Sequence, residues 1–119
     1  MDRKTLIRQY KEKPLQAGVF QVRNTVSGRS LVGSSPNLPG MLNRQRFQLA
    51  SGSHPDKELQ KDWNDLGPEV FAFEILDILE PPDEPSRNPT EDLRVLKEIW
   101  LDKLSESGVA LYPQSRWGT

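Results

Sequence analysis

The sequence predicts an α/β (α+β) fold of three strands and about three helices. Three features predict it: two strand-like segments joined by a polar turn over residues 18 to 35, an apolar strand over residues 70 to 79, and helical spacing of apolar residues in the segments around that strand. The chain has 119 residues, which suffice for one compact domain and are too few for two ordinary ones. We therefore expect a single domain.

The first two strands are expected to pair as an antiparallel hairpin. The segment AGVFQVRN alternates polar and apolar side chains and is rich in β-branched and aromatic residues, a pattern typical of a strand. Thr25 to Gly28 forms a polar turn, with glycine at a position suited to positive φ. The segment RSLVGSS follows as the second strand, so the two strands can pair across the turn.

Two helices are expected before the third strand. Asn37 can cap the first helix, with Pro39 in its first turn, and a Ser-Gly pair ends it. The second helix begins near Pro55, behind Ser53 or His54 as its cap, and a Gly-Pro pair ends it. Leu42, Arg46 and Leu49 share one face of the first helix, and Leu59, Trp63 and Leu66 share one face of the second.

The third strand, over residues 70 to 79, is apolar on both faces apart from Glu74 and Asp77. This pattern is typical of a central strand whose two faces are covered. The proline-rich acidic segment 80 to 90 is expected to be a surface loop. A strongly amphipathic last helix then runs to a stop at Gly108. Its inner face is expected to carry Leu93, Leu96, Lys97, Trp100 and Leu104.

The expected domain occupies residues 17 to 104. Residues 1 to 16 are expected to form an N-terminal helix or arm. Residues 105 to 119 are expected to form an irregular C-terminal tail that packs on the domain, through Tyr112 and Trp117.

The composition argues against several classes of protein. The chain has no cysteine, and His54 is its one histidine, which argues against zinc chemistry and a cysteine nucleophile. No apolar run approaches the roughly 20 residues that a membrane span needs, and the first residues have no apolar signal-peptide core. We therefore expect a soluble cytoplasmic protein that does not act in a membrane.

The charges are distributed unevenly along the chain. Residues 1 to 61 hold 11 Lys and Arg against 4 Asp and Glu, whereas residues 62 to 119 hold 5 against 13. A basic half can form a phosphate-binding surface, but the two halves can also neutralise one another in the fold, and we favour this simpler interpretation. The candidates for nucleic-acid contact are Arg23, Arg29, Arg44, Arg46 and, from the last helix, Lys97.

Two tripeptides of the hairpin resemble a known motif pair. Gly18-Val19-Phe20 takes the GIY place, and Leu31-Val32-Gly33 takes the YIG place ten residues further on. The segments SSPNL, GSHPDKELQKDWNDLG and FAFEILDILE follow in the order hairpin, two helices, strand, helix. Residues 17 to 104 thus resemble the GIY-YIG nuclease superfamily, in particular a small stand-alone subfamily with a degenerate active site.

The resemblance implies a central three-stranded antiparallel sheet flanked by helices, and cleavage of a phosphodiester with one divalent metal. In the superfamily a hairpin tyrosine is proposed as the general base and a second tyrosine helps to organise the site. A helical arginine stabilises the developing phosphate charge, and one carboxylate holds Mg²⁺. We therefore expect Mg²⁺ as the cofactor if the chain is active, and none otherwise.

Three positions lack the groups that this chemistry needs. The first tyrosine falls on Phe20, which has no hydroxyl, and the second falls on Leu31. We favour a role for both as core residues of the hairpin. The arginine falls on Met41, so Arg44 or Arg46 reaches the site only if a short insertion around Pro39-Gly40 shifts the helix, and Arg44 is the better candidate. Arg44 is equally well explained as an ordinary surface residue.

The remaining two groups are also altered or ambiguous. His54 resembles a histidine that can meet the scissile phosphate or the water of the metal, but a role as a helix cap explains it equally well. The metal carboxylate, three residues before Trp100-Leu101, falls on Lys97, whose ammonium would repel Mg²⁺. Glu98 is a weak candidate for the metal ligand, because one residue turns a side chain by about 100° around the helix.

The favoured function is a domain that binds DNA or RNA with weak or lost cleavage, in which Lys97 neutralises a phosphate where the metal would sit. Two alternatives stay open. One is an active Mg²⁺-dependent endonuclease with an altered site made of Arg44, His54 and Glu98. The other is a module on the same fold that binds a protein partner, with which the acidic second half agrees. Whether the chain is an enzyme is left open by the sequence.

Overall fold

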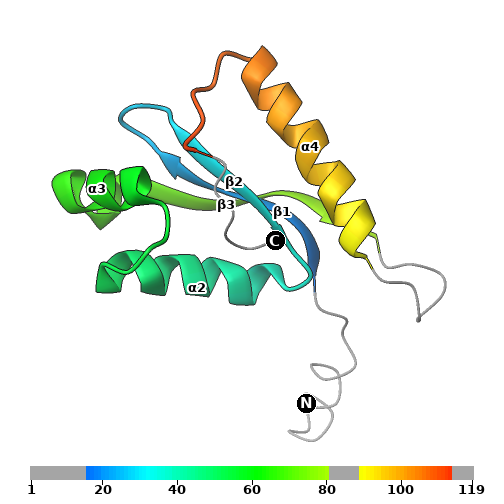
Figure 1. Ribbon diagram of the computed structural model, residues 1–119, viewed down its shortest axis with the longest axis horizontal. Coiled ribbons are helices and arrows are strands. Elements are labelled where there is room, and N and C mark those ends of the chain that lie inside the picture. The colour runs from blue at the N-terminus through cyan, green and yellow to red at the C-terminus, as the bar shows by residue number, and fades with distance from the viewer. Residues whose placement is uncertain (1–15, 81–88, 114–119) are drawn as a thin grey trace, which may run out of the picture.

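The structure is a computed structural model, and it describes residues 16 to 80 and 89 to 113. The element order is hairpin, two helices, strand and helix, as expected (Figure 1). The strands are β1 (Ala17–Asn24), β2 (Ser30–Ser35) and β3 (Phe71–Leu79). The helices are α2 (Leu38–Ser51), α3 (Lys57–Leu66) and α4 (Thr90–Glu106), with a 3-10 turn, η1 (Pro68–Val70), before β3.

The three strands form one antiparallel sheet in the order β2-β1-β3. Helices α2 and α3 cover one face of this sheet, and α4 covers the other (Figure 1). The predicted α+β fold, a three-stranded antiparallel sheet with three flanking helices, is confirmed.

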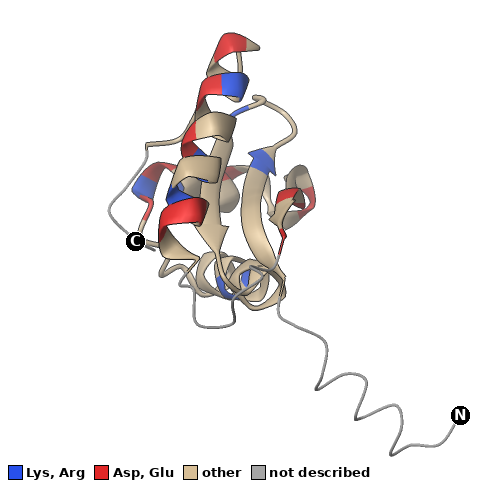
Figure 2. Cartoon of the chain, turned by 90° about the vertical axis from the view of Figure 1, so that its right-hand side faces the viewer, with Lys and Arg blue, Asp and Glu red and all other residues tan. Residues whose placement is uncertain are grey.

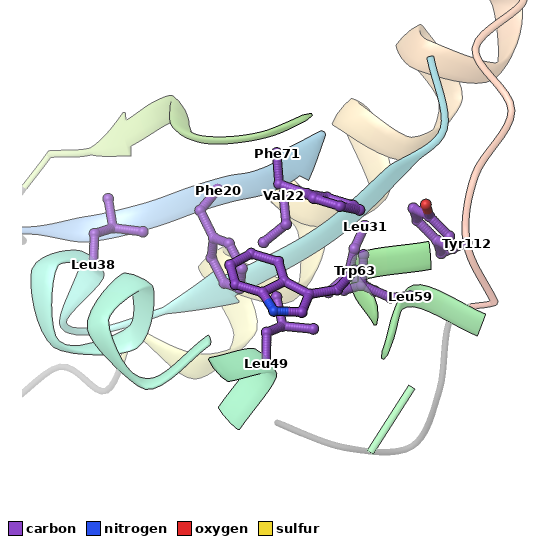
Figure 3. Close-up of a cluster of buried hydrophobic side chains, with 9 residues drawn as sticks. All are labelled: Phe20, Val22, Leu31, Leu38, Leu49, Leu59, Trp63, Phe71 and Tyr112. Carbon is purple, nitrogen blue, oxygen red and sulfur yellow. The ribbon is translucent and has the colours of Figure 1, made fainter. Parts of the chain in front are cut away.

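The main core lies between the sheet and the α2–α3 pair. Phe20 and Val22 of β1 point into it because alternate residues of a strand face the same side. Val19 and Val32 lie on the opposite face, where α4 adds the buried Leu93. The main core consists of Phe20, Val22, Leu31, Leu38, Leu49, Leu59, Trp63, Phe71 and Tyr112 (Figure 3).

The expectation that the third strand is central is wrong, because β1 is the middle strand and β3 pairs with β1 alone among the described residues. The polar residues of β1 made it look unlike the middle strand of a sheet. Gln21 is buried, but it donates to Glu74 of β3 at 3.1 Å and accepts from Ser30 of β2 at 2.7 Å. These bonds satisfy a polar side chain that a central strand otherwise excludes.

The start of α3 also differs from expectation. Its cap is Asp56, not Ser53 or His54, and the carboxylate accepts from the backbone N–H groups of Glu58 and Leu59. Asn37 caps α2 as predicted, by accepting from the Gly40 N–H. Leu66, expected on the buried face of α3, is 42% exposed.

The segment after α4 returns to the sheet. Gly108, at φ 85°, ends the helix, and Leu111 then forms a parallel bridge with Ser30 at the outer edge of β2. Tyr112 is buried in the main core (Figure 3). The expected N-terminal arm and Trp117 lie outside the described residues, as does most of the loop expected at 80 to 90. The division into arm, domain and tail thus stays a prediction.

Across the described parts of the chain, every helix is too short or too polar to cross a membrane.

Candidate functional site

The two glycines of the hairpin motifs are required by close contacts. Gly18 lies beside an irregularity in the pairing of β1 with β3, where an added Cβ would come within 2.0 Å of the Asp77 carbonyl oxygen. Gly33 pairs with Phe20 across the hairpin, and a Cβ there would lie 2.6 Å from Cζ of the Phe20 ring. Both glycines are therefore explained by packing, without any catalytic role.

Phe20 and Leu31 occupy the two positions where the resemblance places tyrosines. Both side chains are fully buried in the main core (Figure 3). Neither side chain carries a group that can donate, accept or relay a proton. The hairpin thus presents hydrocarbon where the proposed mechanism needs hydroxyl groups.

Helix α2 carries the two arginines that the sequence proposed as phosphate contacts. Met41, at the register of the catalytic arginine, packs against the main core. Arg44 is exposed, and the described part of the chain offers it no ion pair. The Arg46 guanidinium lies 4.4 Å from the ring centroid of Phe73, a cation–π contact. Both guanidinium groups therefore lie at the surface of the same helix without a carboxylate partner among the described residues.

A shallow cavity of about 600 Å³ opens beside Arg46. Aromatic rings dominate its wall, because Trp63 packs against Phe71 at 5.3 Å and edge-on against Phe73 at 6.2 Å between ring centroids. Its lining residues are Arg46, Ala50, Trp63, Pro68, Phe71 and Phe73. This aromatic cavity combines π faces with one positive charge.

His54 is buried between α2 and α3. Its Nδ1 accepts from the Asp56 N–H at 3.0 Å, so Nε2 must carry the proton that bonds Gln45 Oε1 at 2.6 Å. Its own N–H donates to Gln60 Oε1 at 3.0 Å. Burial lowers the pKa of His54, and the nearby Asp56 carboxylate opposes this shift. His54 therefore connects two helices as a neutral ring, and both of its nitrogens are engaged within the protein.

Lys97 and Glu98 lie on α4 and point in different directions. Lys97 is half-buried, and this burial lowers the pKa of its ammonium. Glu98 is exposed and accepts from Arg94 Nη1 at 2.8 Å. Helix α4 is held on the sheet by Trp100 Nε1, which donates to Asp77 Oδ2 at 3.0 Å. An ammonium, not a carboxylate, therefore lies on the side of α4 nearer the sheet.

The candidate residues do not gather in one cluster. Phe20 and Leu31 lie in the main core on the face that α2 and α3 cover, together with the His54 network. Lys97 and Glu98 come from α4, on the opposite face of the sheet (Figure 1). The site expected from the sequence is therefore divided between two faces.

Arg23 and Arg29, two further candidates for nucleic-acid contact, are paired with acidic residues. Arg23 Nε donates to Glu74 at 3.0 Å. Arg29 bonds Glu58 at 3.1 Å, and its guanidinium lies 4.2 Å from the ring centroid of Tyr112. The Arg23 pair follows the simpler expectation that charges of the two halves neutralise one another, whereas Arg29 and Glu58 belong to the same half of the chain.

The sequence did not reveal a polar cluster around Tyr112. Its hydroxyl donates to Asp62 Oδ2 at 2.6 Å and accepts from Asn24 Nδ2 at 3.2 Å. Burial and the hydrogen bond to Asp62 raise the pKa of Tyr112 to about 12. The three side chains are far apart in the sequence. The only local indication of the cluster was that Tyr112 is an aromatic residue in a tail. The cluster thus joins the C-terminal segment to the hairpin and α3.

The donor set for Mg²⁺ does not fit the residues present. The ion prefers several oxygen ligands, at least one of them a carboxylate. Lys97 takes the position where the resemblance places the carboxylate, Glu98 is engaged by Arg94, and the described ranges contain no group of three metal-binding side chains. We therefore assign no metal ligand and derive no step that needs the ion.

Comparison with known proteins gives one curated relative and two solved structures. The chain matches no protein family model. It is 29% identical over 92 residues to intron-associated endonuclease 1 of Enterobacteria phage T4. This match covers 76% of the chain but 34% of that protein, so the chain spans about a third of the length of the curated relative.

The solved structures are both of the catalytic domain of intron endonuclease I-TevI. A glutamate-to-alanine mutant of that domain has a TM-score of 0.66 at 24% identity, covers 85% of this chain and 95% of that one, and supports the fold alone. The other structure, of the catalytic domain of homing endonuclease I-TevI, has a TM-score of 0.62 at 26% identity. It covers 81% of this chain and 95% of that one. The likeness thus extends over nearly all of a catalytic domain.

Proposed function

The chain belongs to the GIY-YIG nuclease superfamily, and from this membership we propose that it binds nucleic acid while its phosphodiester cleavage is weak or lost. The fold places two arginine side chains on one exposed helix. The groups that would perform hydrolysis are replaced or engaged elsewhere. Binding and cleavage are therefore separable in this domain.

Lys97 is the observation that carries the proposal. It takes the position where the resemblance places the metal carboxylate, and it lies half-buried, one helical turn from the buried Leu93. A positive charge there repels a divalent cation but attracts a phosphate group. The substitution thus removes the metal and keeps an electrostatic partner for the nucleic-acid backbone.

The other positions support the same conclusion. Phe20 and Leu31 offer no hydroxyl to activate water. His54 uses both ring nitrogens to connect α2 with α3, so proton transfer to a substrate would disrupt a buried network. Without the base, the second hydroxyl and the metal ligand, the chain should lose more of its cleavage activity than a single substitution would remove.

An active endonuclease with an altered site is the second candidate. The relative and both solved structures bear the name endonuclease, and this observation favours it. The site would then consist of Arg44, His54 and Glu98 and would need Mg²⁺. Glu98 would have to exchange Arg94 for the metal, and His54 would have to leave Gln45.

The test separates binding from cutting. Purified protein is titrated into labelled duplex DNA, single-stranded DNA and RNA at several salt concentrations, and it is incubated with supercoiled plasmid in Mg²⁺, Mn²⁺ or EDTA. We expect binding that weakens as salt rises and no metal-dependent nicking. Lys97→Glu should weaken binding, whereas Lys103→Glu, the same charge change elsewhere on α4, should have a smaller effect.

Two results would contradict the proposal in different ways. Metal-dependent nicking that disappears in Glu98→Ala but persists in Glu106→Ala would establish the endonuclease. Absence of salt-dependent binding to every nucleic acid would leave the protein-interaction module as the remaining function.

A further inference from the structure

The exposed side of α2 has an unusual composition. We call Asn43, Phe47 and Ala50, which lie along the outermost line of this helix, the α2 crest. Phe47 is 72% exposed, more than any other large hydrophobic residue in the described ranges. The buried side of α2 is formed instead by Leu38, Gln45 and Leu49. Packing within the described chain therefore does not explain an aromatic residue at this position.

Two arginines flank the α2 crest. Arg46 precedes Phe47 by one residue and Arg44 by three, so they lie on opposite sides of Phe47, each about 60 to 100° around the helix. Helix α2 contains no acidic residue, whereas α4 carries five. Figure 2 shows red bands along α4 and no red on α2. The α2 crest thus presents the exposed ring of Phe47 between two positive charges, those of Arg44 and Arg46. No carboxylate of the same helix offsets these charges.

From these observations we infer that the α2 crest binds a nucleic-acid strand at an unpaired base, with Phe47 stacked on the base and Arg44 and Arg46 contacting the flanking phosphates. This inference rests on the proposed function and names the kind of nucleic acid. An exposed ring can stack on any unpaired base, because every base has a π face, and the guanidinium groups follow the backbone. Bases that stay paired and stacked in a duplex offer Phe47 no such face.

The aromatic cavity extends this surface on the Arg46 side. Arg46 and Ala50, one turn apart on α2, line it together with the rings of Trp63, Phe71 and Phe73. Guanidinium planes and aromatic rings are the surfaces on which proteins stack extruded bases. A base next to the one on Phe47 therefore meets a second π surface with the Arg46 guanidinium beside it.

The test compares three labelled DNAs that differ only in base pairing: a single strand, a blunt duplex, and the same duplex with one bulged adenine. Phe47→Ala should weaken binding of the single strand and of the bulged duplex by roughly tenfold and leave the blunt duplex within about twofold. Phe47→Trp should retain binding. Val26→Ala, which removes an equally exposed apolar residue from the hairpin turn, is the matched control and should change nothing.

The arginines and the base can be probed separately. Arg44→Gln and Arg46→Gln should weaken binding of all three DNAs and lower the salt slope by about one each, because they contact phosphates. Replacing the bulged adenine with 2-aminopurine reports stacking directly. We expect its fluorescence to fall on binding to the unmodified protein and to change much less with Phe47→Ala.

The outcomes distinguish this inference from the proposed function. Binding of the DNAs with no selective effect of Phe47→Ala would overturn the inference and leave the proposed function intact. Absence of binding to all three DNAs and to single-stranded RNA would overturn both. If Phe47→Ala instead abolished self-association in sedimentation velocity, with single-strand binding unchanged, the α2 crest would be an interface between copies, and the inference would be wrong.

Discussion

At Gly33 the hairpin can pack over the Phe20 ring only because glycine has a hydrogen atom in place of a side chain. The ring lies against Gly33 of β2, so the space that a side chain would need is already filled by Cζ and Cε1. The same contact requires a glycine opposite Phe20 whether or not the ring carries a hydroxyl group. At the residue scale, packing alone therefore accounts for Gly33.

Gly33→Ala should lower the free energy of unfolding by roughly 1 to 3 kcal/mol, because the added methyl group overpacks the core at Phe20. Phe20→Leu in the same chain should relieve part of that cost, so the two changes should not be additive. Urea denaturation of both single variants and the double variant measures the coupling. Strict additivity would mean that the steric account is wrong.

His54 predicts a pH dependence of stability. The folded chain holds His54 neutral with a pKa below its ordinary 6.5, so between the two pKa values the unfolded chain binds more protons. The free energy of unfolding should therefore be fully present above about pH 6.5 and fall as the pH is lowered toward the folded pKa. Urea midpoints between pH 8 and pH 5.5 measure this effect. Since the chain has one histidine, His54→Gln should flatten the profile, and an unchanged slope in that variant would exclude His54 as its origin.

At the scale of elements, the sequence predicted which segments form strands and helices better than how they join. Local patterns were sufficient for the hairpin, α2 and α4. The central position of β1 depends on partners for Gln21 that come from Ser30 and Glu74. Likewise, the His54 network needs Gln45 and Gln60 from two different helices. Such partners depend on the tertiary fold and leave no periodic pattern in the sequence.

The cap of α3 is a test at this scale. Asp56→Ala should cost about 1 kcal/mol of stability, because two N–H groups at the start of the helix lose their acceptor. Asp65→Ala, on the exposed side of the same helix, should change stability by less than about 0.5 kcal/mol. Circular dichroism during thermal unfolding compares the two variants. Equal losses in both would indicate that the cap contributes nothing beyond surface charge.

For the molecule as a whole, the arrangement of charge and of candidate groups on the two faces of the sheet could not be predicted from the order of residues. The sequence drew attention to Phe20, Leu31 and Lys97 as candidate positions, but it did not show that they lie on different faces. It also counted opposite charges without showing that Arg23 and Arg29 are paired while Arg44 and Arg46 have no carboxylate partner among the described residues. Because α2 and α4 cover opposite faces, we expect the effects of Phe47→Ala and Lys97→Glu on binding to add.

Tyr112 joins three parts of the molecule, so its titration reports on the whole fold. Its pKa is raised to about 12, so the folded chain keeps the phenol neutral where the unfolded chain ionises near 10. Stability from this group should be present below about pH 10 and be lost as the pH rises toward 12. Tyrosinate absorbance, taken as the difference between the unmodified chain and Tyr112→Phe, should show the shifted midpoint. A midpoint near 10 in folded protein would contradict the buried hydrogen bonds.

The bridge between Leu111 and Ser30 has a consequence for where the chain can be shortened. Backbone groups of Ser30 bond Ala110 and Tyr112, so this short segment covers part of the outer edge of β2. A fragment ending at residue 104 would leave a hole in the core in place of Tyr112, and it would uncover the backbone N–H and carbonyl of Ser30 at the edge of β2. Uncovered strand edges recruit other strands, so such a fragment should aggregate edge to edge. The few residues after α4 thus help to keep the sheet from growing beyond its own chain.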